Sequence, residues 1–209
     1  MYTLYWARGT GAMAPQIILE EVAASYELVV LDEDKGEEME AEYLAVNPRG
    51  QIPSLGLPDG SIMTESAAIV LHLADSHADI GLLPVVGSAA RAQVYRWLFY
   101  AVANLYEAVL RLYYSDRYTA DAACAESVKL SAREYLDRSW DLLEAERGDG
   151  PYLLGDQYSV IDPYLLMLAQ WHEQPETLFA RCPKLKLLCD TVQSRPAVQR
   201  IWSQHYPEG

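Results

Sequence analysis

Residues 1–80 combine two spacings of hydrophobic positions. Alternation and β-branched runs predict strands, whereas apolar residues three and four apart predict helices. Asp59-Gly60 marks a tight hairpin between two of the strands. The predicted elements are strands at 2–6 and 27–31, short strands on either side of 58–60, and helices at 12–24, 43–46 and 67–74. Their order, βαβ followed by αββα, predicts a small mixed sheet covered by helices.

Strand-like spacing stops after Pro84, and only helical patterns follow. The segment 89–114 has no internal proline or glycine and predicts one long helix. The other predicted helices lie at 121–146, which ends in Gly-Asp-Gly-Pro at 148–151, and at 159–173, 185–193 and 197–203. We therefore predict an α/β domain over residues 1–80 and an all-helical domain over residues 87–209.

Charge and composition exclude several classes of function. With 16 basic and 30 acidic residues the net charge is −14, which argues against a nucleic-acid surface. No apolar stretch approaches the roughly 20 residues of a membrane span, and no basic segment precedes a long apolar run at the N-terminus. The three cysteines lack metal-like spacing and fit reduced thiols packed in helices. We expect a cytoplasmic protein without a metal site.

Two short segments carry the clearest chemistry. In Asn47-Pro-Arg-Gly-Gln-Ile-Pro53, a proline stands where an apolar strand should begin. Because proline cannot donate a ladder hydrogen bond, this position predicts a cis peptide bond and a sharp turn that exposes the preceding backbone. Thr64-Glu65-Ser66 then opens a helix whose first N–H groups are free. An exposed strand edge beside a helix N-terminus suits a small peptide that ends in a carboxylate.

Ser159-Val-Ile-Asp162 is a clear helix start in the second domain. It places a hydroxyl at the N-cap and a carboxylate three residues later, so that each can satisfy a free amide of the other. Pro163 follows in the first turn, where a missing N–H costs little. We predict that Asp162 stabilises a buried helix and has no catalytic role.

The chain is similar to the cytosolic glutathione transferases over nearly its full length. Three short motifs of that family occur in order and at the family spacing, namely Gln51-Ile52-Pro53, Glu65-Ser66 and Ser159 to Asp162. The pattern Asn-Pro-x-Gly-Gln-x-Pro most resembles the bacterial beta-like members. The resemblance implies an α/β plus all-α fold, in which a thioredoxin-like N-terminal domain precedes a helical-bundle C-terminal domain. It also implies a detoxification enzyme that forms a homodimer.

The resemblance assigns a role in glutathione binding to each residue of the first two motifs. The backbone of Ile52, kept free by the turn at Pro53, would pair with the cysteinyl part of glutathione. Glu65 would accept from the γ-glutamyl ammonium, and Ser66 would hold the α-carboxylate at the helix N-terminus. Gln51 would reach the glycyl end, where other members often carry a lysine.

The group that activates the glutathione sulfur departs from the family pattern. In this family a donor just after the first strand, a tyrosine, serine or cysteine according to class, lowers the thiol pKa. The cysteine position of the beta-like members aligns near Gly11, and the segment 5–13 contains neither cysteine nor serine. Three candidates remain: the hydroxyl of Thr10, the phenol of Tyr5, and the backbone amides of Gly11 and Ala12.

A second departure lies in the long helix, where Tyr106-Glu107 replaces the His-Lys pair of many beta-like members. Side chains at helical spacing could line an apolar pocket for the second substrate, or could pack in a dimer interface or the domain core. The candidates are Trp6, Met13, Tyr106, Leu110, Tyr113 and Tyr114.

The leading hypothesis is therefore transfer of glutathione, bound as thiolate, to an electrophilic hydrophobic substrate. Two alternatives remain open. One is glutathione-dependent ether cleavage, dehalogenation or isomerisation. The other is a protein that keeps the tripeptide site and lacks turnover.

Overall fold

The computed structural model describes residues 1–207, which form two compact units. The first unit comprises residues 1–83 together with the C-terminal segment from residue 193, and the second comprises residues 84–192. The two units are described separately below.

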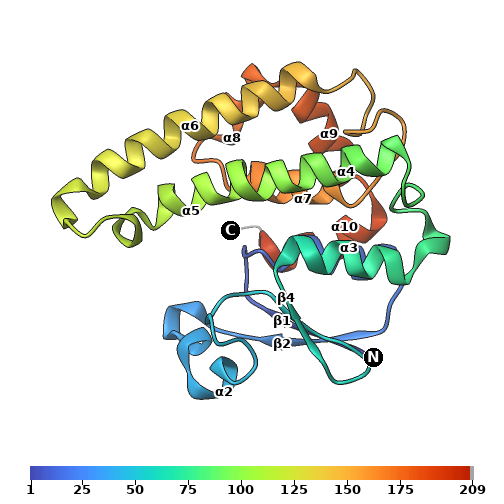
Figure 1. Ribbon diagram of the computed structural model, residues 1–209, viewed down its shortest axis with the longest axis horizontal. Coiled ribbons are helices and arrows are strands. Elements are labelled where there is room, and N and C mark those ends of the chain that lie inside the picture. The colour runs from blue at the N-terminus through green and yellow to red at the C-terminus, as the bar shows by residue number, and fades with distance from the viewer. Residues whose placement is uncertain (208–209) are drawn as a thin grey trace. The chain divides into compact units, whose positions relative to one another are not determined.

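The first unit is built on a four-stranded sheet (Figure 1). Its strands are β1 (Tyr2–Trp6), β2 (Tyr26–Val30), β3 (Ser54–Gly56) and β4 (Ile62–Thr64). They lie in the order β2-β1-β3-β4, with β1 parallel to β2 and antiparallel to β3, and β3 antiparallel to β4. Its helices in this part of the chain are α1 (Met13–Glu21), α2 (Ala41–Leu44) and α3 (Ser66–Ser76). The predicted βαβ and αββα order of a thioredoxin-like domain is confirmed.

Alternation along β1 explains how this sheet is covered. Tyr2, Leu4 and Trp6 are buried, and the residues between them are only partly covered. Helix α1 is buried from its first residue through Leu19, and it packs against α3. In Figure 1, α3 lies on one side of the strands and the short α2 on the other. The hairpin between β3 and β4 turns at Gly60, whose φ of +87° is a conformation that favours glycine.

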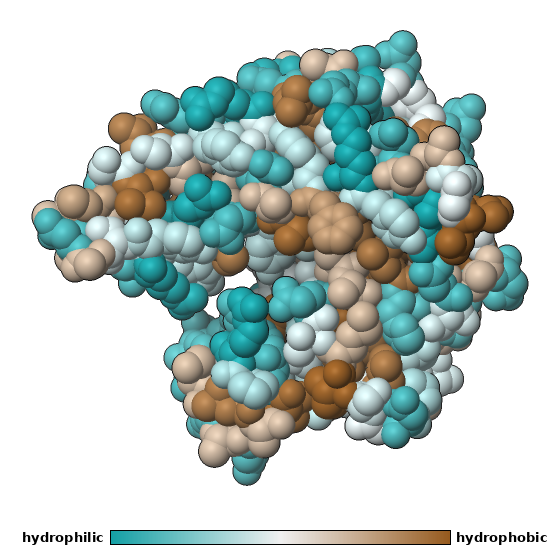
Figure 2. All heavy atoms as spheres, viewed as in Figure 1, coloured by the Kyte–Doolittle hydropathy of each residue, from teal (hydrophilic) through white to brown (hydrophobic). Residues whose placement is uncertain are grey.

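The second unit consists of helices within the described residues, apart from two isolated β-bridges in the loop before α7. Its helices are α4 (Ala89–Tyr100), α5 (Glu107–Tyr113), α6 (Ala125–Glu146), α7 (Ile161–Gln170), α8 (Pro175–Arg181) and α9 (Pro183–Gln193). The sequence did not predict α8, which begins at a proline and spans two turns. In Figure 2 the visible face of this unit is largely hydrophilic and is broken by a few apolar side chains.

The long helix predicted over 89–114 is interrupted by a π-helical stretch, Ala101–Tyr106, between α4 and α5. Asn104 lies inside it and donates a side-chain hydrogen bond to the carbonyl of Tyr100 at 3.1 Å. A side chain that competes for the carbonyl four residues back disturbs the regular ladder. Tyr135 on α6 also hydrogen-bonds the Asn104 amide oxygen, which keeps that side chain in place.

Helix α7 forms the centre of the helical unit and is buried along nearly its whole length. The carboxylate of Asp162 accepts the amides of Ser159 at 2.7 Å and Leu153 at 2.8 Å, and the Ser159 hydroxyl at 3.2 Å. The Ser159 hydroxyl therefore donates to the carboxylate, and only the carboxylate half of the predicted reciprocal cap is formed. Burial raises the pKa of Asp162 to about 6.

The last helix, α10 (Pro196–His205), belongs to the first unit. The sequence-based boundary had assigned all residues from 87 onward to the helical domain. Ion pairs fasten α10 to α1, with Arg195 on Glu21 and Arg200 on Glu20, each at 2.6 Å. An amphipathic pattern shows that a helix has a buried face and does not show against what that face packs.

Helices long and apolar enough to cross a membrane are absent from residues 1–207.

Candidate functional site

Three chain segments meet at one end of the sheet. Tyr5 on β1 lies opposite Ser54 on β3, and Ser54 lies opposite Thr64 on β4. Because antiparallel neighbours run in opposite directions, the residues before Ser54 lie beside those that follow Tyr5 and Thr64. The register therefore brings together Ile52-Pro53, the loop after β1, and Glu65-Ser66.

The loop before β3 is held by two side chains that fix one carbonyl. The carbonyl of Gln51 accepts the Tyr43 hydroxyl at 2.6 Å and the Asn47 side-chain amide at 2.7 Å. Asn47 is 3% exposed, and its own oxygen accepts the amide of Arg49 at 3.1 Å. Sequence reasoning missed both side chains as site residues. The available signal was an asparagine that can close an Asx turn in a short loop before a strand.

Gly50 allows this loop to pass close to the segment before α2. Its φ is +58°, and a Cβ added there would lie 2.6 Å from the Met39 sulfur and 3.0 Å from the Glu38 carbonyl oxygen. Only glycine fits such a position without displacement of its neighbours.

Ile52 lies just before β3 and is only partly buried. Its N–H and C=O make no hydrogen bond to any residue in 1–207. The Ile52–Pro53 peptide bond is cis, and the Gln51 side chain is exposed beside it. The fixed loop thus presents one unpaired backbone unit that can bind an extended peptide edge to edge.

Glu65 and Ser66 form the junction between β4 and α3. Glu65 has φ 67° and ψ 102°, a conformation that residues with a side chain rarely adopt and that costs roughly 1–3 kcal/mol. Its exposed carboxylate lies 3.6 Å from the Arg49 guanidinium, which connects the two motifs. Ser66 is the first residue of α3 and is 8% exposed. A strained residue at a helix N-terminus marks a place where geometry serves binding.

The loop after β1 uses its polar groups differently. The Thr10 hydroxyl donates to the carbonyl of Ala7 at 2.8 Å and accepts the amide of Ala12 at 3.3 Å. The amide of Gly9 donates to the Nδ1 atom of His205 at 3.3 Å. Gly11 is buried, and its amide has no hydrogen-bond partner in residues 1–207. The amides of Ala7, Arg8 and Thr10 also have no hydrogen-bond partner in residues 1–207, so the free backbone donors of this loop include Gly11, which lies nearest the start of α1.

Comparison with known proteins identifies this arrangement. Residues 1–75 match the glutathione S-transferase N-terminal domain, and residues 103–202 match the glutathione S-transferase C-terminal domain. The GST-like protein YncG of Escherichia coli strain K12 is 30% identical over 202 residues, which are 96% of this chain and 97% of that protein. The chain belongs to the glutathione S-transferase family.

Solved structures of the family agree with the whole fold. A glutathione transferase homologue from Sulfitobacter with bound glutathione has a TM-score of 0.91 at 29% identity, over 98% of both chains. The bacterial beta-class glutathione S-transferase of Sphingomonas chungbukensis has a TM-score of 0.82 at 27% identity, also over 98% of both chains. The relatives of this glutathione S-transferase chain thus include beta-class members.

Tyr5 lies on the sheet face that α2 covers. Its ring packs on Tyr43 with 5.5 Å between ring centroids, and its cross-strand partner Ser54 is hydrogen-bonded to the Tyr43 hydroxyl at 2.9 Å. The Tyr5 hydroxyl has no hydrogen-bond partner within the described chain. Packing thus accounts for the ring, while the phenol remains available as a donor.

Of the six predicted pocket residues, Trp6 and Met13 belong to the first unit and the other four to the helical unit. Met13 is 0% exposed, and Trp6 is 7% exposed with its indole N–H donated to Gln16 at 2.9 Å. Both side chains therefore fill the interior, in contrast to the expectation that they line an open pocket.

In the helical unit, by contrast, aromatic side chains gather around one tryptophan. The Tyr106 ring meets Trp171 edge to face at 5.2 Å, and the Tyr113 hydroxyl donates to the Trp171 carbonyl at 2.9 Å. Leu110 is half-buried and Tyr114 is exposed on the same stretch. Glu107 pairs with Arg111 at 3.7 Å, so a cation accompanies the carboxylate that replaces the family's lysine.

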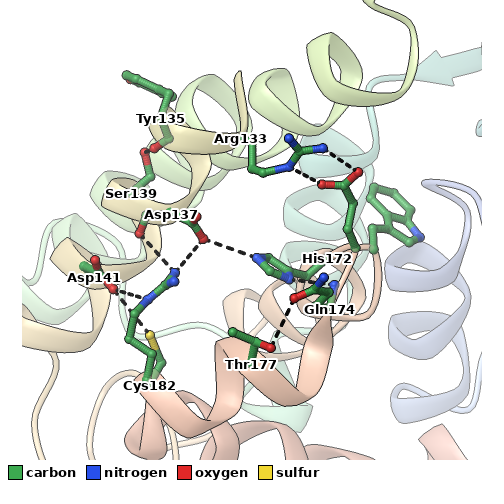
Figure 3. Close-up of polar contacts among 12 residues, drawn as sticks. Arg133, Tyr135, Asp137, Ser139, Asp141, His172, Gln174, Thr177 and Cys182 are labelled. Carbon is green, nitrogen blue, oxygen red and sulfur yellow. Dashed lines mark hydrogen bonds and ion pairs between the residues drawn. The ribbon is translucent and has the colours of Figure 1, made fainter. Parts of the chain in front are cut away.

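A polar cluster in the helical unit connects α6 with the segment that follows α7 (Figure 3). Arg133 forms two hydrogen bonds to Glu173, which hold the pKa of that carboxyl below its usual range. Asp137 contacts both His172 and Arg181, and Asp141 also contacts Arg181. Each of these charges has a partner, so the cluster braces the helices and leaves no free group for a ligand.

Proposed function

We propose that this chain is a glutathione transferase that binds glutathione as thiolate and transfers it to an electrophilic, hydrophobic substrate. One observation carries the proposal. An unpaired backbone unit at Ile52 lies beside the start of α3 and the loop after β1. A tripeptide with a carboxylate, an ammonium and a central thiol matches the groups that these three segments offer.

Each part of glutathione has a counterpart at this site. The cysteinyl N–H and C=O pair with the backbone of Ile52, which the cis bond at Pro53 follows directly. The α-carboxylate of the γ-glutamyl part binds Ser66 and the first amides of α3. Glu65 accepts the ammonium of the same residue. Gln51 reaches the glycyl end with a neutral side chain, so that end is held less strongly than by a lysine.

The sulfur would then lie against the loop after β1. Among the amides of this loop without a partner in residues 1–207, we favour that of Gly11, because it lies nearest the N-terminus of α1, where a negative charge is stabilised. Thr10 and Tyr5 remain the side-chain candidates. A hydroxyl has one proton, and Thr10 donates it to Ala7, so Thr10 must give up that bond before it can donate to sulfur. A donor in a site with little water lowers the thiol pKa and populates the thiolate.

The helical unit supplies the contacts to the hydrophobic second substrate. Tyr106 and Tyr113 both contact Trp171, Leu110 follows the same helical spacing, and together these side chains would provide an apolar surface. Such a surface holds an apolar substrate without taking part in bond formation, so the rate derives from positioning and from the thiolate.

We also propose that the protein is cytoplasmic and acts as a homodimer, as its family resemblance implies. Phe99 on α4, 68% exposed, offers apolar area for that contact.

Calorimetric titration with glutathione tests the binding site. Ser66→Ala and Glu65→Ala should each weaken binding by about tenfold or more, since each removes a charge-assisted hydrogen bond. Ser76→Ala, at the opposite end of α3, is the matched control and should bind like the unaltered protein. Equal affinities for all four proteins would remove the site from the proposal. Conjugation of glutathione to an electrophilic aromatic halide, followed in the same proteins, tests the transfer.

One observation favours a second candidate, a glutathione-binding protein without turnover. The side chain in the serine-like position already uses its only proton inside the loop. If the Gly11 amide does not lower the thiol pKa, tight binding without conjugation should result. Glutathione-dependent ether cleavage, dehalogenation and isomerisation use the same thiolate and differ only in the second substrate.

A further inference from the structure

A buried hydrogen-bond network connects the last helix of the chain to the loop after β1. His205 on α10 is 2% exposed. Its Nδ1 atom lies 3.3 Å from the amide nitrogen of Gly9, and its Nε2 atom lies 2.8 Å from the amide oxygen of Gln16 on α1. The same Gln16 oxygen accepts the indole N–H of Trp6 at 2.9 Å, and the indole nitrogen also lies 3.1 Å from the Nε2 atom of His205. Four segments of the first unit therefore meet at one imidazole.

The partners of His205 determine its tautomer. The amide of Gly9 and the indole N–H of Trp6 can only donate, and they face the two different ring nitrogens. The Trp6 N–H has the Gln16 oxygen as its shorter acceptor, whereas the Gly9 amide has only Nδ1, so we infer that Nδ1 is the unprotonated acceptor. Nε2 then carries the proton and donates to Gln16, whose oxygen also receives the Trp6 proton. Every polar atom of the imidazole has a partner in this arrangement. Burial lowers the pKa of His205 to about 4, so the ring is neutral at physiological pH and keeps the acceptor that Gly9 needs.

Other contacts hold Gln16 and α10 without His205. The Gln16 side-chain nitrogen donates to Gln204 at 2.9 Å. The ion pairs of Arg195 and Arg200 and the buried side chains of Val198 and Ile201 fasten α10 independently. Replacement of His205 should therefore leave the helix docked.

We propose that His205 is a positioning residue for the sulfur end of the glutathione site, acting through the Gly9 amide on the direction of the Gly11 amide. Gly9 has a φ of +69° and lies two residues before Gly11. With no Cβ to limit its backbone, Gly9 can rotate unless its amide is held. The Nδ1 acceptor holds it. This inference rests on the proposed function, because it assumes that the sulfur is activated by this loop.

Two isosteric substitutions separate the two nitrogens of the imidazole. In His205→Asn the amide oxygen takes the place of Nδ1 and can still accept from Gly9. In His205→Gln the side-chain amide takes the place of Nε2, keeps the contact with Gln16 and loses the acceptor for Gly9. We expect about tenfold faster hydrogen exchange of the Gly9 amide in His205→Gln, a factor typical of one lost hydrogen bond, and little change in His205→Asn.

If the proposed function holds, the rate of catalysis should also fall in His205→Gln and be kept in His205→Asn. His205→Gln should lower kcat for conjugation by about fivefold to tenfold with the glutathione dissociation constant unchanged, and His205→Asn should restore it. Equal losses in both variants, or losses that follow thermal stability, would overturn the positioning role.

Nitrogen NMR of the unaltered protein tests the tautomer of His205 without any variant. We expect the proton on Nε2, and a proton on Nδ1 would also overturn the positioning role. Faster Gly9 exchange in a protein that does not bind glutathione would instead refute the proposed function and keep the structural coupling.

Discussion

Two loops of the first unit border the same site and are built in opposite ways. In the loop 47–53, the buried side chain of Asn47, together with Tyr43 of α2, holds the carbonyl of Gln51, and the backbone of Ile52 is left without a partner in residues 1–207. The loop 7–12 satisfies its only hydroxyl internally and depends on His205 for the amide of Gly9. Under the proposed function, recognition of the tripeptide would be a local property of the chain, whereas control of the sulfur would depend on a contact made 196 residues away.

The largest expected difference between the loops is in their response to acid. Burial depresses the folded-state pKa of His205 from 6.5 to about 4, so its contribution to stability is present above pH 6.5 and is lost as the pH falls through 4. That contribution is about 3 kcal/mol, because each pKa unit corresponds to about 1.4 kcal/mol. The unaltered protein should have a larger free energy of unfolding than His205→Asn at pH 7. This difference between the two proteins should be smaller at pH 4 by about 3 kcal/mol.

Asp162 should oppose this effect. Its folded-state pKa is raised from 3.8 to about 6, so its contribution is present below pH 3.8 and is lost as the pH rises through 6. Denaturant unfolding of His205→Asn and of the unaltered protein, measured at several pH values, separates the contributions of His205 and Asp162. Both proteins contain Asp162, so its contribution cancels in the difference between them. A difference that does not change with pH would mean that folding leaves the pKa of His205 at its ordinary value. The loop 47–53, held by groups that do not titrate in this range, should keep its protection throughout.

The second prediction removes the brace of the loop 47–53. Asn47→Ala should lower the free energy of unfolding by about 2 kcal/mol, because it deletes one buried hydrogen-bond partner for Gln51 and one for Arg49. Glutathione binding should weaken in parallel, since the Ile52 backbone would no longer be held in place. Chemical denaturation and calorimetry measure the two effects, with Ser61→Ala in the exposed hairpin as the control. Unchanged affinity in Asn47→Ala would show that the brace serves only stability.

The turn and the helix start at the borders of the proposed glutathione site could be predicted because each motif is contiguous in sequence. Ile52-Pro53 and Glu65-Ser66 need only a turn, a short hairpin and a helix start, which local residue types determine. Asn47 was inside the first motif, but its role required the position of the Gln51 carbonyl. His205 could not be found, because a single histidine in an amphipathic helix carries no sign of the partner it meets. The π-helical stretch at Ala101–Tyr106 likewise depends on Asn104 in its folded surroundings.

The third prediction uses the strain at Glu65. Glu65→Gly should raise the stability of the protein by up to about 1 kcal/mol, because glycine adopts φ 67° without steric cost. The same change removes the carboxylate and should weaken glutathione binding by about tenfold. A variant that is more stable and binds less tightly would show that the strain serves the ligand. Loss of stability in Glu65→Gly would instead mean that the exposed pair with Arg49 stabilises the fold.

The smallest expected effects distinguish the two side-chain donors. Thr10→Val removes the bonds to Ala7 and Ala12 and should cost about 1 kcal/mol of stability, whereas Thr10→Ser keeps both. Tyr5→Phe removes a hydroxyl without a partner in residues 1–207 and should change stability by less than about 0.5 kcal/mol. If either variant lowers kcat well beyond its effect on stability, that hydroxyl rather than the Gly11 amide contacts the sulfur.

The thiol pKa of bound glutathione tests the central claim most directly. Ultraviolet absorbance of the thiolate, measured against pH for the saturated protein, reports this pKa without a second substrate. We predict a value at least one unit below the roughly 8.5 of a free thiol, since a buried amide at the start of α1 favours the thiolate. A bound thiol that titrates at its free value would contradict the transferase account and leave a protein that holds glutathione without activating it.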